Sequence, residues 1–334
     1  MSRIQKGIAT ILGSLLVLLL IWQTDIASVI DGFKSVSTKT LLLLVFLQII
    51  TQVLIAYQWK RLAWSNHREV TTRQMLQMNM AGSFVESITP SVKLGGEAVK
   101  VWWLKERLRW TGEEATSLLM VQKSISGLVF LGYTLLLSSL YLLHFWTNIS
   151  IEWAWNFSEN HWKYLLCYAG FLVFISTIGI YAYKMLKRKH VDKIKSIGKI
   201  RDGLQNYWLR IRADKVEMTV QLVLASVIWF LYPLKMIILT ADLGIDVRFW
   251  VAAAVVFIAY TVAMIPALPG SVGTFEGTMV GLLTIAGMSP SLALALTLIF
   301  RTITFWLVCL ISGLTTGCFH IREVKNKRYK VFSG

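Results

Sequence analysis

Two charged pairs recur at matching places in this otherwise apolar chain. Glu97 follows a Pro- and Gly-containing interruption and precedes Lys123 by 26 residues, and Glu276 follows a second interruption and precedes Arg301 by 25. A charge inside an apolar helix is costly, so we expect each cation to face the protein interior and to pair with a carboxylate, within its own half or across halves. Cations beside helix N-termini favour an anionic ligand such as a phosphate. The two matching pairs therefore predict one anion-binding or gating site to which both halves of the chain contribute.

Each interruption starts at a proline and reaches its glutamate seven residues later, with glycines between them. Proline cannot donate the helical hydrogen bond, so each break should separate two helices and turn the N-terminus of the second helix toward a polar cavity. The candidate headgroup-binding or gating residues are Pro90, Lys93, Gly95, Gly96, Glu97, Lys100, Lys123, Pro269, Gly270, Gly273, Glu276 and Arg301.

Simpler explanations exist for the same residues. The charged pairs could be structural ion pairs that lock a helical bundle, and a glutamate in the first turn of a helix is ordinary capping. Lys93 and Lys100 could be interfacial charges, and the two breaks could be unrelated loops. We interpret Lys235, near the outer end of its apolar segment, as a side chain that extends to the membrane surface.

Catalytic signatures are missing from the sequence. It has no phosphate-binding Gly loop ending in Lys-Ser/Thr, no H-E-x-x-H and no G-x-S-x-G, and its three cysteines and five histidines form no metal-ligand spacing. We therefore expect no catalytic residue, metal or cofactor. Glycosyl transfer from a lipid carrier stays open, because carboxylates at a membrane edge could perform it.

The composition indicates a membrane protein. Hydrophobic residues make up 55% of the 334 residues and charged residues only 16%, which excludes a disordered chain, a secreted disulfide scaffold and an ordinary soluble enzyme. The apolar runs also argue against nucleic acid as the partner for the net charge of +16. About 20 helical residues cross a bilayer. Six apolar segments are predicted to cross the bilayer, at roughly 8–22, 40–59, 115–143, 163–183, 217–241 and 290–317.

The interrupted stretches 70–108 and 249–287 are predicted to be re-entrant broken helical hairpins. Each half of the chain then consists of a span, a hairpin and a span with a buried cation, over about 40–143 and 217–317. The single helix 163–183 between them reverses the second half. The sequence thus predicts an all-α integral membrane protein, one polytopic domain over 1–320 built as an inverted repeat, an arrangement that in transporters indicates a binding site.

Charge sets the predicted orientation. With a cytoplasmic N-terminus, the inside segments carry 27 basic and 11 acidic residues, whereas the outside loops carry 4 and 6. This distribution predicts a multi-pass protein of the plasma or inner membrane with both termini in the cytoplasm. Segment 184–215 is basic and amphipathic, either a helix on anionic lipid or a solvated linker, and 321–334 is a basic cytoplasmic tail.

Two stretches of the sequence resemble a known family. SITPSVKLGGEAVKVWWLKE resembles the Pro…Gly-Gly-Asp-x-x-Arg box of the lysylphosphatidylglycerol synthase transmembrane family, also called flippase-like membrane proteins. IPALPGSVGTFEGTMVGLLTIAGMSPSLALALTLIFRTITFW resembles its second box, Pro-Gly-Gly-x-Gly-x-x-Glu followed by an Arg-bearing helix, and the resemblance covers about 10–320. The departures are Glu97 in place of Asp, Lys100 and Lys123 in place of Arg, and Ser271 in place of the second Gly. Lysine does not offer the bidentate phosphate contact of arginine.

The resemblance implies a protein that handles lipid. The sequence ends about 17 residues after the last predicted span, so we expect the lipid-handling part of the family without its soluble synthase domain. It implies binding and translocation of an anionic lipid, a phospholipid or a polyprenyl-phosphate-linked species, between leaflets. The alternatives are an integral-membrane glycosyltransferase and an accessory subunit of a lipid-modifying or glycosylation enzyme. Besides the lipid, the expected partners are such an enzyme or a second copy of the chain.

Overall fold

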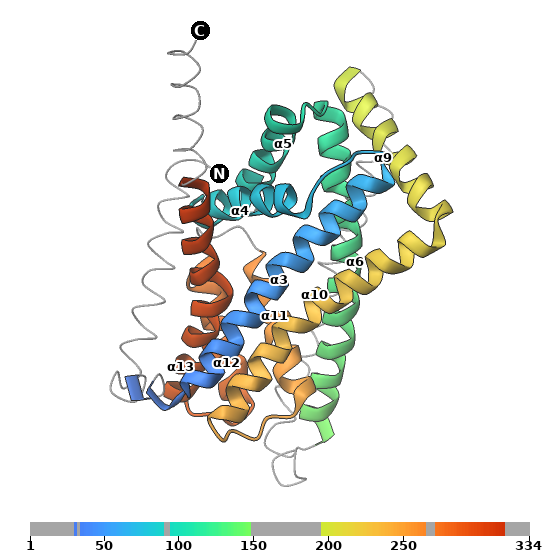
Figure 1. The fold of residues 1–334 in the computed structure, drawn as a ribbon. Helices are drawn as coiled ribbons and strands as arrows, with labels where there is room; N and C mark the ends of the chain where they lie inside the picture. The colour runs from blue at the N-terminus through green and yellow to red at the C-terminus, as the bar shows by residue number, and fades with distance from the viewer. Residues whose placement is uncertain (1–29, 32–33, 90–93, 148–194, 265–270, 318–334) are drawn as a thin grey trace, which may run out of the picture.

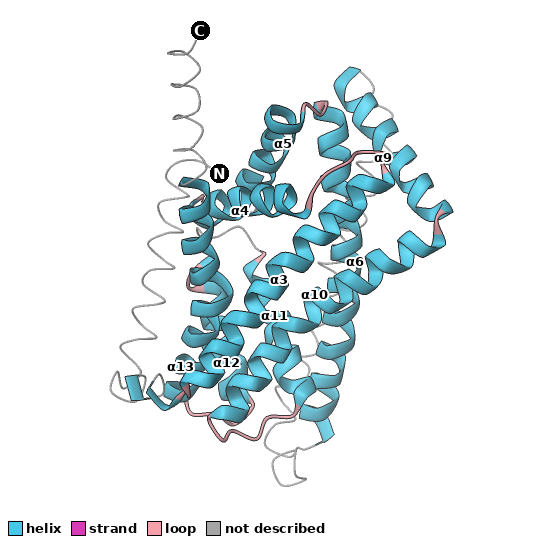
Figure 2. Ribbon diagram, in the orientation of Figure 1, coloured by secondary structure: helices cyan, strands magenta, loops and turns pink. Residues whose placement is uncertain are grey.

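The protein is helical throughout the part of the chain that the structure describes. A computed structural model describes residues 30–31, 34–89, 94–147, 195–264 and 271–317, and every regular element in them is a helix (Figures 1 and 2). The helices are α3 (Thr38–Ser65), α4 (Thr72–Ile88), α5 (Leu94–Leu108), α6 (Gly112–Thr147), α9 (Lys195–Ala213), α10 (Lys215–Asp242), α11 (Phe249–Ala263), α12 (Thr274–Ile285) and α13 (Pro290–Arg301). A π-helical turn, η3 (Thr302–Trp306), continues α13, and regular helix resumes to Gly317.

Polar residues mark the helix starts. Ser37 accepts a hydrogen bond from the Thr40 amide at the start of α3, and Asp214 accepts one from the Glu217 amide at the start of α10. Thr71 forms a reciprocal capping box with Gln74 at the start of α4. These side chains satisfy amides that have no partner within the helix, so each helix begins at a defined residue.

Four helices are long and apolar enough to cross a bilayer. They are α3, α6 over Gly112–Leu142, α10, and the continuous helix Pro290–Gly317, which we call the C-terminal span. The predicted segments 40–59, 115–143, 217–241 and 290–317 correspond to them, so these four predictions are confirmed. The predicted spans 8–22 and 163–183 lie outside the described residues, as does the tail 321–334, so the number of spans and the inverted repeat stay predictions.

Both interrupted stretches contain two helices, as the sequence predicts. The first stretch forms α4 and α5, and the second forms α11 and α12. Helices α4 and α5 pack backbone to backbone: a Cβ atom at Gly96 would lie 2.6 Å from the Gly82 carbonyl oxygen. Only glycine permits that approach. Pro90, Lys93, Pro269 and Gly270 lie outside the described residues.

The core has two parts, one around each hairpin. One cluster joins α4 and α5 to the C-terminal half of α3 and the N-terminal half of α6, with Trp59, Leu104 and Leu118 at its centre. The other joins α11 and α12 to α13, the C-terminal half of α10 and the C-terminal half of α6. Because opposite halves of α6 contact the two hairpins, the hairpins lie at opposite ends of the long helices (Figure 1).

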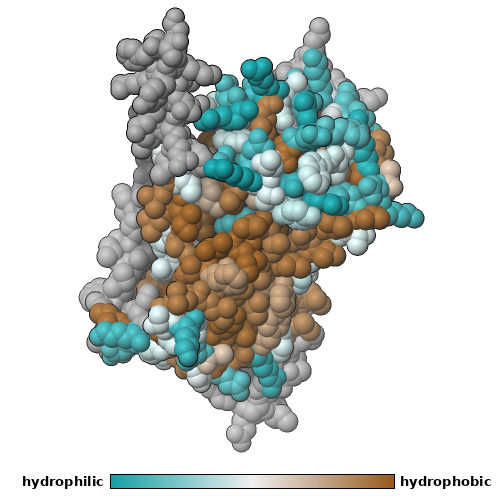
Figure 3. Space-filling model, viewed as in Figure 1, coloured by the Kyte–Doolittle hydropathy of each residue, from teal (hydrophilic) through white to brown (hydrophobic). Residues whose placement is uncertain are grey.

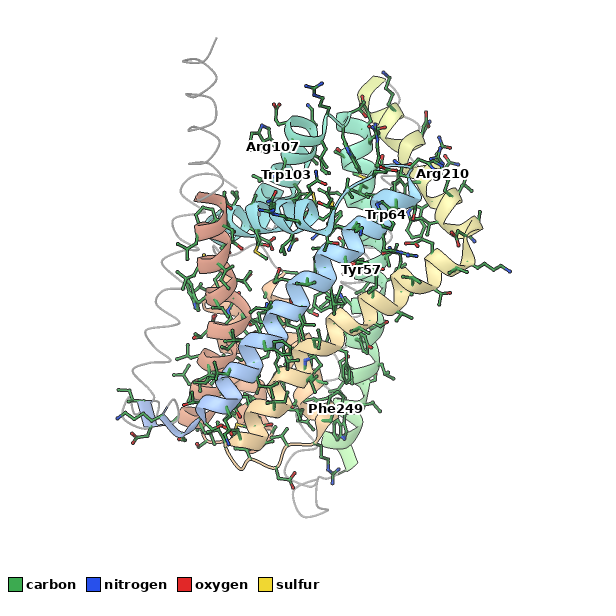
Figure 4. The ribbon with its side chains drawn as sticks, viewed as in Figure 1. Tyr57, Trp64, Trp103, Arg107, Arg210 and Phe249 are labelled. Carbon is green, nitrogen blue, oxygen red and sulfur yellow. The ribbon has the colours of Figure 1, made fainter. Side chains whose placement is uncertain are left out.

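The surface separates into a hydrophobic belt and hydrophilic ends. In the face drawn in Figure 3, the hydrophobic colour covers α3, α10 and the C-terminal span, and the hydrophilic colour covers the end formed by α5 and α9. Figure 4 shows Arg107 and Arg210 at that end and Phe249 toward the opposite one. Helices α5 and α9 at this end belong to segments 60–114 and 184–217, which the charge count assigns to the cytoplasm.

Helix α9 confirms the helix predicted within 184–215, but its apolar face contacts protein. Ile211 and Tyr207 are buried, and the Tyr207 hydroxyl donates to the backbone oxygen of Leu62. Ser117 on α6 donates to the Ile200 carbonyl at 3.4 Å. Helix α9 therefore packs in part against α3 and α6, and its placement on lipid or in solvent stays a prediction.

Candidate functional site

A polar cavity lies among the long helices and opens between the two hairpins. This central cavity has a volume of about 230 Å³, room for a group many times the size of a water molecule. Side chains of α3, α4, α5, α6, α10, α11 and the C-terminal span line it. Its charged and amide-bearing residues are Gln52, Gln58, Asn79, Glu86, Lys100, Gln122, Lys123 and Arg301.

The first predicted charge pair is a three-residue cluster. The Oε1 atom of Glu97 lies 3.0 Å from Lys100 Nζ and 2.8 Å from Lys123 Nζ. Lys100 is buried and Lys123 is 46% exposed, so Lys123 is the more accessible of the two ammonium groups. Both cations line the central cavity and Glu97 does not. The carboxylate thus holds two positive charges at the wall of the cavity.

The second predicted pair is buried on both sides. Arg301 Nε donates to Glu276 Oε1 at 2.8 Å, and the exposed fractions of the two side chains are 5% and 8%. The other oxygen of Glu276 accepts the Gly273 amide at 2.7 Å, which caps α12. Gly273 has φ 85°, a conformation that favours glycine. The Arg301 guanidinium also lies 4.2 Å from the centre of the Phe305 ring, within cation–π distance.

The charges of the first cluster depend on one another. Burial raises the pKa of Glu97. The positive charges of Lys100 and Lys123 together lower it by more, so the pKa of Glu97 lies below its ordinary value. For Lys100 on the same helix, burial and then the neighbouring Lys123 lower the pKa, against the opposing effect of Glu97. Glu86 also acts on Lys100 across the cavity, so the two ammonium groups are balanced by two carboxylates, and an anionic ligand would compete with these for the cations.

The structure sorts the predicted site residues into two groups. Lys100, Lys123 and Arg301 line the central cavity, so residues from both halves of the chain meet there. Gly95, Gly96, Glu97, Gly273 and Glu276 do not line it. The expectation that the helix N-termini point into a polar cavity stays a prediction, because the breaks at 90–93 and 265–270 lie outside the described residues. Among the described residues, Gly96 packs against α4, and the Gly273 amide is bound by Glu276. The ion pairs form within each half.

Several lining residues were missed by the sequence analysis. Glu86 contributes a carboxylate to the cavity wall, and Trp229, Tyr232 and Tyr260 form an aromatic wall with ring centres 5.2 to 6.1 Å apart. Glu86 is the one acidic residue in an otherwise uncharged stretch of α4, which is a signal that the sequence carries. The aromatic residues gave no such signal, because packing alone accounts for aromatic side chains in apolar helices.

Lys235 contradicts its sequence-based interpretation. Its side chain is buried, with 1% of the residue exposed, and it does not reach the membrane surface. Its ammonium donates to Gln48 Oε1 and, at 3.0 Å, to Thr51 Oγ1. The reason is that α3 packs along α10 and offers two polar side chains at this depth, so the lysine bends inward.

A chain of polar side chains connects the hydrophilic end to the central cavity. Arg61 pairs with Glu217, whose Oε1 atom accepts from Gln221 at 2.8 Å. Gln122 donates to Gln58 at 3.2 Å, and both amides line the cavity. Such groups need partners in a low-dielectric interior, which explains why they gather along one path.

The described residues hold no group of three His, Cys, Asp or Glu side chains arranged to bind a metal ion. Their carboxylates at the central cavity hold cations or, for Glu86, face the cavity itself. The described part of the site offers charged groups and hydrogen-bonding amides.

The spans, the hydrophobic belt and the charged cavity define a multi-pass α-helical membrane protein with an internal polar site. The chain belongs to the family described as "Lysylphosphatidylglycerol synthase TM region", which it matches over residues 7–312. It is 24% identical to a UPF0104 membrane protein of Pyrococcus horikoshii over 98% of this chain and 99% of that protein. It is 22% identical to a UPF0104 membrane protein of Methanothermobacter thermautotrophicus, over 83% and 85% of the two chains. A relative in Methanocaldococcus jannaschii is 21% identical over 98% of both.

Proposed function

We propose that the protein binds the headgroup of an anionic lipid, a phospholipid or a polyprenyl-phosphate-linked species, in the central cavity and passes it between leaflets. The observation that carries the proposal is the meeting of Lys100, Lys123 and Arg301, from both halves of the chain, at one cavity. Membership of a family named for the membrane region of a phospholipid synthase supports lipid as the ligand.

The cavity wall presents cationic groups that an anion can contact. Lys100, Lys123 and Arg301 line the central cavity, as does the carboxylate of Glu86. Glu97 and Glu276 balance these cations from behind the wall, so an anionic headgroup would compete with those carboxylates for them. Gln122 adds an Oε1 atom that is buried without a hydrogen-bond partner among the described residues. A polar headgroup would supply the missing partner and offset the desolvation of that amide.

The position of the cavity supports movement between leaflets. The two hairpins lie at opposite ends of the long helices and both contribute to holding its cations, Lys100 directly and Arg301 through Glu276. In transporters with broken helices, one set of elements rocks against another around a fixed site. A cavity between two such hairpins can open to either end by this kind of motion.

Translocation in liposomes tests the proposal. The purified protein is reconstituted with fluorescent phosphatidylglycerol, and the loss of inner-leaflet fluorescence to an impermeant quencher is followed. Wild-type protein should exceed protein-free vesicles, and Lys123→Ala should lower the rate at least about tenfold, as for loss of one charged contact. Lys199→Ala, which removes an exposed charge on α9, is the matched control. Equal rates for all vesicles would refute the proposal.

The remaining parts of the proposal concern setting and partners. The protein functions in the plasma or inner membrane with both termini in the cytoplasm, and it works as a carrier without catalysing a covalent reaction. Glu97 and Glu276 are both engaged with cations, and Glu86 is the single carboxylate among the described residues that line the cavity, so these residues offer no carboxylate pair for glycosyl transfer. Product formed from a purified lipid-linked sugar donor would reverse this conclusion, and co-purification of a lipid-modifying enzyme would assign an accessory role.

A further inference from the structure

A second hollow adjoins the central cavity and has the opposite character. This side groove has a volume of about 240 Å³ and lies between α3, α4 and the C-terminal half of the C-terminal span. The surface that it exposes is almost wholly apolar, with Leu76, Met80 and Ile311 among its lining residues. Its rim includes Ile49 and Val53, which are 48% and 44% exposed. Both lie on α3 within the hydrophobic belt, so the groove faces the hydrocarbon of the bilayer.

The side groove and the central cavity adjoin each other. Gln52 on α3 and Val308 on the C-terminal span line both of them. Gln52 Oε1 accepts a hydrogen bond from Asn79 at 3.0 Å, which holds the α3 side of this junction in place. Val308 forms the opposite side of the junction. It comes just after η3, the π-helical turn that follows Arg301 in the C-terminal span. Such turns are frequent at functional sites.

An amphiphile fits the two spaces together, whereas other ligands fit one. A soluble anion such as inorganic phosphate would use only the charged cavity, and a simple hydrocarbon would use only the groove. We propose that the side groove holds a hydrocarbon chain of the same lipid whose headgroup lies in the central cavity, with the chain leaving between Gln52 and Val308. This inference rests on the proposed function and adds to it a chain-binding subsite.

The subsite has a mechanistic consequence. A lipid held in this way keeps its chain in the bilayer while its headgroup sits among charges, so the chain is never transferred to water. The contact with the chain also makes recognition depend on the lipid tail as well as on the headgroup. A protein variant in which the path of the chain is blocked should bind the lipid more weakly, even though the headgroup of the lipid is unchanged.

Photo-cross-linking on wild-type protein tests the location directly. The protein is placed in nanodiscs with phosphatidylglycerol that carries a diazirine near the headgroup end of one acyl chain, and labelled peptides are identified by mass spectrometry. Labels should map to α3 around Ile49–Val53 and to the helix around Leu307–Ile311, and unlabelled phosphatidylglycerol should compete. Labels spread evenly over the exposed belt would mean annular lipid only and would overturn the inference. Disulfide cross-links between cysteines introduced in the groove and in residues 8–22 would show that this segment occupies the groove. That result would also overturn the inference.

A blocking substitution separates the subsite from the headgroup site. Ile311→Trp fills the side groove at a residue that does not line the central cavity, and Leu314→Trp, 70% exposed on the same helix, is the matched control. Ile311→Trp should weaken phosphatidylglycerol binding about tenfold, the factor that burial of roughly two methylene groups supplies, and leave glycerophosphate binding unchanged. If both ligands bind wild type but Ile311→Trp changes neither, the subsite is wrong and the proposed function stands. If neither ligand binds wild type, the proposed function itself fails.

Discussion

The ion pair between Arg301 and Glu276 gives the sharpest test of whether the buried charges are structural, functional or both. Arg301→Met removes the guanidinium but keeps a flexible apolar side chain between the Phe275 and Phe305 rings. It leaves Glu276 with 8% of its side chain exposed and without its cationic partner. The double variant Glu276→Gln with Arg301→Met removes both charges, and the glutamine can still accept the Gly273 amide that caps α12.

The expected magnitudes differ strongly between these variants. Removing one partner of a buried pair costs about 3–5 kcal/mol of unfolding free energy, because an uncompensated charge stays behind. Replacing both partners by uncharged groups of similar volume is often neutral. We therefore expect Arg301→Met to lose about 3–5 kcal/mol and the double variant to recover most of that loss.

Reversible unfolding of the detergent-solubilised protein, followed by tryptophan fluorescence during a denaturant titration, measures the difference. The solvent-facing Arg248→Met is a control for loss of an arginine at the surface. Stability of Arg301→Met within about 1 kcal/mol of wild type would refute the reasoning, since an exposed pair contributes no more than that.

Three further predictions use the same assay. Glu97→Gln should lower the unfolding free energy near neutral pH. The difference in unfolding free energy from wild type should shrink as the pH falls below 4.5, because the pKa of Glu97 in the folded protein is lowered from that value. A difference that grows on acidification would contradict the assigned charges. Gly96→Ala should cost about 1–3 kcal/mol, because its Cβ would meet the Gly82 carbonyl, whereas Gly132→Ala, with open space around it, should cost nothing; equal effects would contradict the packing of α4 on α5. Lys235→Met should leave stability unchanged or raise it, because the buried ammonium has neutral partners in Gln48 and Thr51; a loss above about 3 kcal/mol would mean that its charge is required.

Helix positions were predictable because length and hydropathy decide them. A run of about 20 apolar residues has few alternatives in a bilayer, and the four described spans follow the predicted segments closely. The breaks were predictable for a similar reason, since proline disfavours a continuous helix: α4 ends at Ile88 and α5 begins at Leu94, and α11 ends at Ala263 and α12 begins at Thr274. The relation between the two halves as a repeat is a prediction that these observations leave in place.

The partners of the charges were predictable only in part. The equal spacings from Glu97 to Lys123 and from Glu276 to Arg301 indicated that these residues would pair, and both pairs are present. The sequence left pairing across halves open, because one-dimensional spacing carries no information about which helices are neighbours. Pairing within each half follows from each hairpin packing against the span that comes after it.

The errors come from tertiary contacts that no local pattern encodes. Lys235 was assigned to the membrane surface because it lies near the end of its span, but Gln48 and Thr51 on α3 bind it in the interior. The side groove joins α3 and α4 to the C-terminal span, whose lining residues come more than 200 residues later in the sequence. Neither feature has a periodicity that a single segment could show.

Translocation by the double variant Glu276→Gln with Arg301→Met tests the central claim most directly. This variant should fold, so a loss of transport cannot be attributed to unfolding. If the central cavity passes an anionic headgroup, wild-type protein moves fluorescent phosphatidylglycerol across liposomes faster than protein-free vesicles do, and the double variant falls to the protein-free rate. A stable double variant that transports as fast as wild type would show that Arg301 has no part in handling the headgroup, and it would contradict the account.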